Sequence, residues 1–228
     1  MQPQTTRLAL ITGANKGIGL EIARQLAKAG HIMLLGARDA SLGEAAAATL
    51  RAEGADVRFV NIDLSKPATI QAAAATIEAD YGQLDVLVNN AGIADRADGP
   101  PSKTSIDAMR RIYDVNFFGT LAVTQAMLPL LCKSPSGRIV NVSSGLGSLA
   151  HNGDPSWEFA HAKFLGYNSS KGGLEHADRA TRRRVAEHRH QGQFGRSRVH
   201  SHGFECASWS SDHTGGSGGG RAVSASPG

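Results

Sequence analysis

The segment RLALITGANKGIG, residues 7–19, joins an apolar run to a turn that contains three glycines. A continuous apolar run such as RLALI at 7–11 is typical of a strand buried on both faces of a sheet. The glycines that follow permit a tight turn and let an anion approach the N-terminus of the next helix, expected over roughly 17–29. The segment therefore predicts a phosphate-binding strand–turn–helix unit.

Four more strand-like runs follow, at 31–36, 56–62, 84–90 and 137–144. Helical stretches separate them: one ends near Glu53, one runs from Pro67 to about Tyr81, and a long one runs from about Ser105 to Leu131. This alternation predicts the α/β class, as a Rossmann-like doubly wound parallel sheet with helices on both faces that ends after the fifth strand. Ligands bind such sheets at the carboxyl ends of the strands, so we look for site residues there.

The end of the second strand carries the candidate that distinguishes between cofactors. Arg38 lies 19 residues after Gly19, where a basic side chain can pair with the 2′-phosphate of NADP, and Lys16 adds a second positive charge. An acid at this place would bind the 2′-hydroxyl of NAD instead, and Asp39 stands one position later. We expect NADP(H), with NAD as the alternative.

The third and fourth strands end in further candidates. Asp63-Leu64 would lie beside an adenine ring, although Asp63 could instead cap a helix, a role for which Ser65 competes. In NNAG at 89–92, the small residues allow close approach of a cofactor and the asparagines can fix neighbouring loops. The candidate cofactor-binding residues are Gly13, Asn15, Lys16, Gly17, Ile18, Gly19, Arg38, Asp63, Leu64, Asn90, Ala91, Gly92, Tyr167 and Lys171.

Five motifs stand in a fixed order: TGANKGIG at 12–19, NNAG at 89–92, VNFFG at 115–119, NVSS at 141–144 and YNSSK at 167–171. Together they resemble the short-chain dehydrogenase/reductase family over residues 7–171. Lys16, GAR at 36–38 and the long gap before Tyr167 resemble the NADPH-dependent carbonyl reductase-like members. The resemblance implies NADPH-dependent hydride transfer that reduces an aldehyde, ketone or quinone to an alcohol.

The resemblance also implies four catalytic residues. Tyr167 would protonate the carbonyl oxygen, and Lys171, one helical turn away, would favour the phenolate and bind the nicotinamide ribose. Ser144 would polarise the substrate carbonyl, with Ser143 as the adjacent alternative. Asn116 would help to hold a proton-relay water near Lys171.

Each of these residues alone also has an ordinary structural explanation. Tyr167 could be a half-buried aromatic, Lys171 a solvated helix residue, Ser144 a loop hydroxyl and Asn116 a local cap. Their joint order at strand ends favours a site. The segment between Ser144 and Tyr167 is long, and its ring-bearing side chains are expected to line or cover a substrate pocket: Trp157, Phe159, His161 and Phe164.

The composition changes after Lys171. Residues 172–228 hold 11 of the 27 glycines, eight Arg, no Lys and five acids, but only four Leu, Ile or Val residues. So few aliphatic side chains cannot offset the entropy of ordering a chain. We expect one folded domain over 1–171, its last helix extending to about 190, and a disordered tail over 191–228.

A one-nucleotide slip accounts for this change. Read one base later, codons for residues 172–209 permit AALNMLTVQLAAELRSTGIKVNSVDPGF and further residues, which resembles the continuation that the family expects. We therefore interpret the tail as an out-of-frame translation. We expect lower stability and weak or absent turnover for this chain, and a family-type homo-oligomer is in doubt.

Other classes of function are less well supported. The Arg- and Gly-rich tail could bind nucleic acid, but it holds only Phe194, Phe204 and Trp209 as aromatics. Its histidines lack a standard zinc spacing, so no metal site is expected. A catalytically inactive NADP(H)-binding protein is a further alternative. The start lacks the apolar run of a signal peptide, and no stretch approaches the apolar length needed to span a bilayer, which favours a cytoplasmic protein without a membrane partner.

Overall fold

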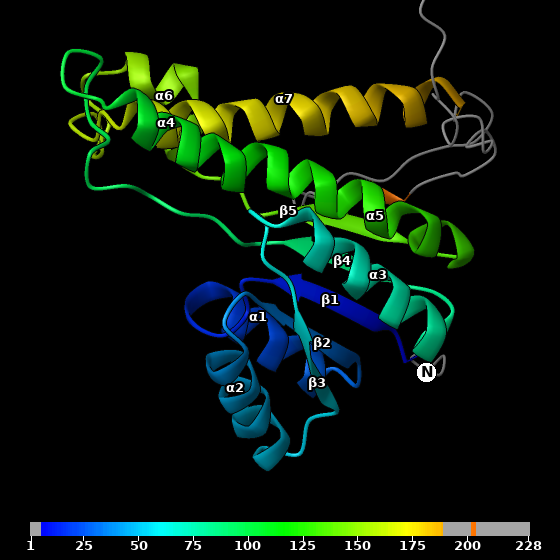
Figure 1. The fold of residues 1–228 in the computed structure, drawn as a ribbon. Coiled ribbons are helices and arrows are strands. Elements are labelled where there is room, and N and C mark those ends of the chain that lie inside the picture. The colour runs from blue at the N-terminus through cyan, green and yellow to red at the C-terminus, as the bar shows by residue number, and fades with distance from the viewer. Residues whose placement is uncertain (1–5, 189–201, 204–228) are drawn as a thin grey trace, which may run out of the picture.

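The computed structural model describes residues 6–188 and 202–203, and the tail expected to be disordered otherwise lies outside these residues. Five strands form a parallel sheet in the order β3-β2-β1-β4-β5, with helices between them (Figure 1). The strands are β1 (Leu8–Thr12), β2 (Ile32–Ala37), β3 (Val57–Asn61), β4 (Val86–Asn89) and β5 (Arg138–Asn141). The Rossmann-like doubly wound fold is thus confirmed.

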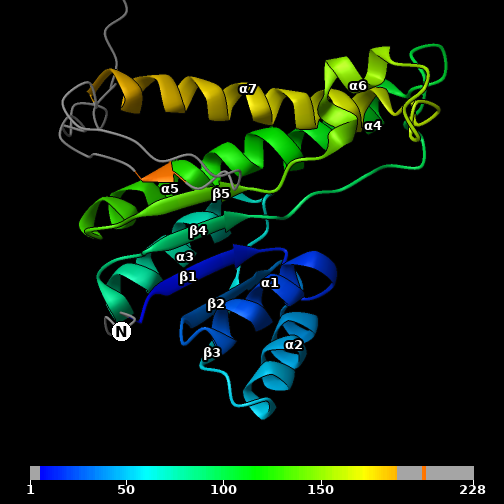
Figure 2. The same cartoon turned by 180° about the vertical axis from the view of Figure 1, so that it is seen from behind.

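The helices follow the alternation that the sequence predicts. They are α1 (Gly17–Lys28), α2 (Ala40–Ala52), α3 (Pro67–Tyr81), α4 (Ile106–Tyr113), α5 (Thr120–Lys133), α6 (Leu149–Gly153) and α7 (Leu165–His188). Pro67 begins α3, where its missing N–H would have had no helical partner. In both views α7 runs alongside α4 (Figures 1 and 2), and the two helices are in contact.

A short strand, β6 (His202–Gly203), pairs antiparallel with β5. Arg138 lies opposite Gly203, and Ile139 lies opposite His202. The sequence does not indicate this strand, because backbone pairing at a sheet edge requires no apolar run. β6 therefore pairs with part of the outer edge of β5.

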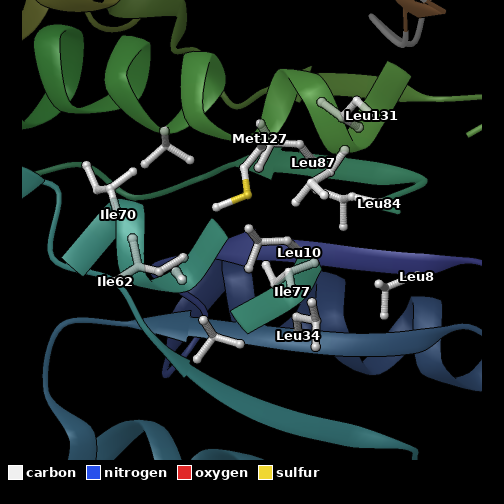
Figure 3. Packing of buried hydrophobic residues seen from close by; sticks show 14 of the residues in the cluster. Leu8, Leu10, Leu34, Ile62, Ile70, Ile77, Leu84, Leu87, Met127 and Leu131 are labelled. Atoms are coloured by element: carbon white, nitrogen blue, oxygen red, sulfur yellow. The ribbon is translucent and has the colours of Figure 1, made fainter. Parts of the chain in front are cut away.

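Two apolar clusters hold the helices against the sheet. One combines Leu10, Leu34 and Leu87 from the strands with Ile77 of α3 and Met127 of α5 (Figure 3). The other joins alternate residues of the same strands to α1 and α2, through residues such as Ala23, Ala47 and Leu50. Both faces of the sheet are buried, which explains why the strands read as unbroken apolar runs.

The order of the strands reverses beside β1. The chain moves outward through β2 and β3, then returns to place β4 on the other side of β1. Doubly wound sheets bind ligands in a crevice at the carboxyl ends of the strands beside such a reversal, which here corresponds to the loops after β1 and β4. The TGANKGIG and NNAG motifs both lie in these loops.

The long helix predicted over 105–131 is divided in the structure. A π-helical segment, η1 (Asp114–Gly119), separates α4 from α5 and contains Asn116. Such segments are rare, and they often occur at functional sites. Sequence periodicity cannot locate them, because they insert only one extra residue per turn.

The continuous helical stretch Ile106–Lys133 is long and apolar enough to cross a membrane by length and composition. The expectation that no stretch reaches this length was therefore wrong. One face of the stretch nevertheless packs in the core, since Val123, Met127 and Leu130 are at most 2% exposed. A helix that packs in a protein core can have the same apolar composition as a membrane-spanning helix.

Truncation of Leu87 should test the packing of this core. Leu87 is fully buried, so Leu87→Ala should lower the free energy of unfolding by about 2–5 kcal/mol through lost burial and a residual cavity. Leu42→Ala is the matched control, because Leu42 is 56% exposed on α2. Equal urea midpoints for the two variants would contradict the packing described here.

Candidate active site

The glycine turn after β1 is shaped for close approach. Gly13 has a φ of +63°, a left-handed conformation, and a Cβ there would come within 2.9 Å of the Cα of Ala91. A Cβ on Gly19 would come within 2.8 Å of the carbonyl oxygen of Gly13. Any side chain at either position would therefore distort the turn.

Two side chains fix this turn to the loop after β4. The amide of Asn90 donates to the carbonyl oxygens of Thr12 at 2.9 Å and Gly13 at 3.1 Å. The hydroxyl oxygen of Thr12 accepts the backbone N–H groups of Asn90 and Ala91, both at 3.1 Å. Asn90, predicted to contact a cofactor, thus acts on the turn itself.

Asp39 and Arg38 have separate surroundings at the end of β2. The carboxylate of Asp39 accepts the N–H of Leu42 at 2.9 Å and the hydroxyl of Ser41 at 2.7 Å, which caps α2. These hydrogen bonds, the backbone one first, lower the pKa of Asp39. Arg38 is exposed, and it forms no side-chain hydrogen bond or ion pair within the described residues. Asp39, the acid on which the alternative of NAD depends, therefore has a structural role as the cap of α2.

The pair after β3 lies farther along the same edge. The carboxylate of Asp63 accepts the N–H and hydroxyl of Ser65 and lies 3.6 Å from Lys66. Asp63 is therefore part of a local turn, while the residue that precedes α3 is Lys66. Leu64 is buried against Gly119.

The crevice fits a dinucleotide. Gly13, Gly17 and Gly19 leave a backbone surface without side chains at the start of α1, and Lys16 is exposed beside it. Ile18 is 66% exposed, so an apolar side chain also stands open there. Free N–H groups and the helix dipole at this end favour a pyrophosphate. Asn15 borders the same turn and is half-buried.

Lys171 is the central residue of the catalytic side. It is only 4% exposed, and its ammonium donates to the carbonyl oxygen of Val142 at 3.0 Å. The same nitrogen lies 5.8 Å from the centroid of the Tyr167 ring and would lie 3.4 Å from a Cβ on Gly92. Lys171 thus contacts the loop after β5, the loop after β4 and the tyrosine.

This ammonium has no carboxylate partner in the described part of the chain. Burial therefore lowers the pKa of Lys171. The alternative of a solvated helix residue is wrong for Lys171. A buried and unpaired cation costs stability, and such groups concentrate at functional sites.

Asn116 is fully buried and makes three hydrogen bonds. Its oxygen accepts the N–H of Ile93 at 2.7 Å, and its amide donates to the carbonyl oxygen of Ile93 and to the hydroxyl of Ser170. Its oxygen would also lie 3.4 Å from a Cβ on Gly92. The side chain therefore joins the loop after β4 to α7 and lies near Lys171 without bonding to it.

The two serine candidates differ in their hydrogen bonds. The Ser143 hydroxyl donates to Glu175 of α7 at 2.9 Å. The Ser144 oxygen accepts the N–H of Leu146 at 3.3 Å and caps the short helix η2 (Gly145–Gly147). The Ser144 proton has no acceptor among the described residues, so this hydroxyl can donate to a ligand.

The η2 helix brings Ser144 next to α7. A Cβ on Gly147 would lie 2.7 Å from the backbone nitrogen of Gly172 and 3.0 Å from the Cβ of Lys171. Only a residue without a side chain permits this contact. Ser144 and Lys171 are therefore held on adjoining backbone segments.

Tyr167 is half-buried in the first turn of α7. Its backbone N–H donates to the carboxylate of Asp98 at 2.9 Å. Its phenol hydroxyl has no hydrogen-bond partner within residues 6–188. The hydroxyl is therefore available to a bound molecule.

The segment between Ser144 and Tyr167 places some, but not all, of its expected side chains near the site. The rings of His151 and Trp157 stack at 4.9 Å, and a Cβ on Gly145 would lie 3.4 Å from Trp157. Phe159 meets Trp157 edge-on and is 48% exposed. His161 and Phe164 are exposed and make no ring contact within the described residues.

Two residues that shape the site, Thr12 and Asp98, were not identified from the sequence. Thr12 was quoted as part of the glycine motif, where its hydroxyl could have been recognised as a possible clamp. Asp98 lies in a turn-forming stretch, DGPP, and nothing local indicates its contact with residues 68 and 69 positions later.

Most of the chain matches a known protein family. Residues 7–190 match the family model for short chain dehydrogenases. The chain therefore belongs to the short-chain dehydrogenase family. This confirms the resemblance read from the five motifs.

Two mammalian proteins are similar to part of this chain. The chain is 45% identical to rat carbonyl reductase (NADPH) 3 over 142 residues, which is 61% of this chain and 49% of that protein. It is 45% identical to human carbonyl reductase (NADPH) 1 over 140 residues, 60% of this chain and 48% of that protein. The chain thus matches about half the length of these relatives.

A solved structure gives the same fold. The gluconate 5-dehydrogenase from Burkholderia cenocepacia, in complex with NADP and tartrate, superposes with a TM-score of 0.66 at 30% identity. The match covers 79% of this chain and 65% of that chain.

The buried Lys171 predicts a specific pH dependence. Its pKa is lowered in the folded protein from an ordinary 10.5, so between these two values the unfolded chain binds more protons than the native one. Stability due to this group therefore rises with pH across that window, and the full burial cost remains below it. Lys171→Met has no such group, so it should lose stability relative to the unsubstituted chain as pH rises through the window below 10.5.

Urea unfolding of both proteins at several pH values measures this difference. Lys103→Met is the control, because Lys103 is exposed in the loop before α4. A difference between Lys171→Met and the unsubstituted chain that stays constant with pH would show that the ammonium keeps its ordinary pKa when folded.

Proposed function

We propose that this protein is an NADPH-dependent reductase that converts the carbonyl group of an aldehyde, ketone or quinone to an alcohol. The observation that carries the proposal is the buried ammonium of Lys171, which has no acidic partner within the described residues and lies beside the Tyr167 ring and Gly92. Burial of this charge lowers the stability of the fold, so a role in ligand binding or catalysis explains it better than a purely structural role. The relatives named carbonyl reductase (NADPH) support the same reaction.

The residues would divide the chemistry among them. A bound NADPH would supply the hydride. The hydroxyl of Ser144 would donate a hydrogen bond to the substrate carbonyl oxygen as negative charge develops there. Tyr167 would deliver the proton to that oxygen, and the Lys171 ammonium would stabilise the phenolate left behind.

Asn116 would act through backbone position more than through a direct contact. Its three hydrogen bonds fix Ile93 and Ser170, which flank Gly92 and Lys171 in the chain. A water held near Lys171 by this region would complete the proton path expected from the family. This role for Asn116 is the least direct of the four.

NADP(H) is favoured over NAD by the end of β2. Arg38 is exposed and has its guanidinium free of side-chain partners among the described residues, while Asp39 is occupied by its cap. A guanidinium can bind a 2′-phosphate through paired hydrogen bonds. The proposed NADP(H) contacts are those of the glycine turn, Arg38, Asp63-Leu64 and the loop after β4.

The proposed folding and catalytic unit is 1–171, with its last helix running on to about 190, in a cytoplasmic protein. We retain the out-of-frame interpretation of the tail, which sequencing of the gene across codons 165–175 would decide. Assays should therefore use both this chain and a frame-corrected one. An inactive NADP(H)-binding protein would bind NADPH without turnover in both forms.

Substitution of the catalytic groups tests the reaction. Tyr167→Phe should lower kcat by about 10²–10⁴-fold, because the proton donor is lost. Ser144→Ala should lower it by about 10²–10³-fold, because one oxyanion donor is lost. Ser143→Ala is the matched control and should retain turnover, since its hydroxyl is bonded to Glu175.

Rates come from NADPH oxidation with a panel of aldehydes, ketones and quinones, and cofactor fluorescence checks that each variant still binds NADPH. Equal losses for Ser143→Ala and Ser144→Ala would reject the assignment of Ser144. Full activity in Tyr167→Phe would reject the proposed reaction.

Arg38→Ala tests the choice of cofactor. Loss of a charge-assisted contact worth about 1.5–3 kcal/mol should weaken NADPH binding roughly 10–150-fold and leave NADH binding unchanged. Arg110→Ala, an exposed arginine of α4, is the control. Titration of cofactor fluorescence measures both affinities, and equal weakening for NADPH and NADH would contradict a 2′-phosphate contact.

A further inference from the structure

We propose that Asp98 is a positioning residue for Tyr167, and this inference rests on the proposed function. Asp98 lies in the loop between β4 and α4, far from Tyr167 in sequence. Its carboxylate holds the first turn of α7, the turn that carries the phenol.

The contact uses both carboxylate oxygens. One accepts the N–H of Gly166 and the other accepts the N–H of Tyr167, each at 2.9 Å. These are the second and third residues of α7, whose N–H groups have no partner within the helix. Asp98 is 9% exposed and Gly166 is buried, so water competes poorly for these groups.

A helix is ordinarily capped by the residue just before it. That position in α7 is Phe164, which has no side-chain acceptor. The acceptor therefore comes from another loop, and it carries a negative charge that also favours the N-terminal end of the helix dipole. The start of α7 depends on that loop for its place.

The loop is itself fixed at several points. The carbonyl oxygen of Gly99 accepts the N–H of Leu165 at 2.8 Å, which adds a second bond to the start of α7. Asp95 forms an ion pair with Arg111 of α4 at 2.8 Å, and Ile93 is held by Asn116. Asp98 is therefore presented from an anchored segment.

The packing also requires close approach. A Cβ on Gly166 would lie 3.0 Å from Ile112 of α4 and 3.3 Å from the carboxylate of Asp98. Glycine at this position lets the helix start lie directly on α4. The backbone of Tyr167 is thus fixed on one side by Asp98, while Lys171, one turn later, is fixed by Val142.

This arrangement predicts an effect on catalysis that is larger than the effect on cofactor binding. If Asp98 is removed, the first turn of α7 loses two hydrogen bonds and Tyr167 moves relative to Lys171 and Ser144. Displacement of a catalytic group by about 1 Å can cost about 10²-fold in rate. The glycine turn makes no contact with Asp98, while Tyr167 is itself a proposed cofactor contact, so NADPH affinity should change less than kcat.

The test compares Asp98→Asn and Asp98→Ala in the full chain and in its frame-corrected form. Asp98→Asn keeps one acceptor oxygen and turns an amide N–H toward the other backbone donor, so its effect should be smaller than that of Asp98→Ala. Ser105→Ala is the matched control, because the Ser105 side chain is the local cap of α4 and accepts from Ala108 at 3.5 Å.

Two readouts are needed, and one is independent of turnover. The chain has three tyrosines, so 3-fluorotyrosine labelling gives few ¹⁹F resonances, and Tyr167→Phe identifies the one from Tyr167. This resonance should shift or broaden in both Asp98 variants and stay in place in Ser105→Ala. Where carbonyl reduction is measurable, kcat should fall by roughly 10–100-fold in Asp98→Ala, with a smaller change in NADPH affinity.

An unchanged Tyr167 resonance in Asp98→Ala would overturn the proposal, as would unaltered kcat in an active form of the chain. Equal changes in Ser105→Ala would overturn it too, because they would reflect general loss of stability. Failure of the proposed function appears differently, as absence of NADPH binding and turnover in every form, and the resonance of Tyr167 then still decides whether Asp98 holds it.

Discussion

The burial of one ammonium group constrains the rest of the site. Lys171 is almost fully inside the protein, with a single backbone carbonyl as its hydrogen-bond acceptor among the described residues. A Cβ at position 92 would lie in contact with it, at 3.4 Å, and position 147 requires a glycine, because η2 lies there against the backbone of α7. Burial of this one charge opposes folding. It also constrains three segments: the loop after β4, the loop after β5 and the first turns of α7.

The loop between β4 and α4 connects the two halves of the site. At its start, Asn90 fixes the glycine turn through the carbonyl oxygens of Thr12 and Gly13. Farther along, Ile93 is held by Asn116 and Asp98 holds the start of α7. A displacement in this loop would reach both the cofactor side and the catalytic side. It is thus a more important element than its irregular sequence suggests.

Residues whose role depends on local backbone were predictable. The turn at 12–19, the succession of five parallel strands along the chain and the pairing of Tyr167 with Lys171 follow from apolar periodicity, glycine positions and helical spacing. The π-helical segment around Asn116 and the partner of Ser143 do not, because Asn116 and Ser143 bond to segments that are distant in sequence. The short β6 strand also arises from pairing across a long interval, and no apolar run marks it.

The sequence by itself determined the doubly wound sheet, the edge at which ligands bind and the residue types gathered there. Those properties follow from periodicity and chain direction, which are encoded within short windows. Only the tertiary structure decided that Lys171 is buried with no acid beside it among the described residues, that within the same residues Ser143 but not Ser144 has an acceptor for its proton, and that Asp98 holds Tyr167. Burial and long-range hydrogen bonds are properties of packed segments, and the physical environment of a group exists only once those segments are in contact.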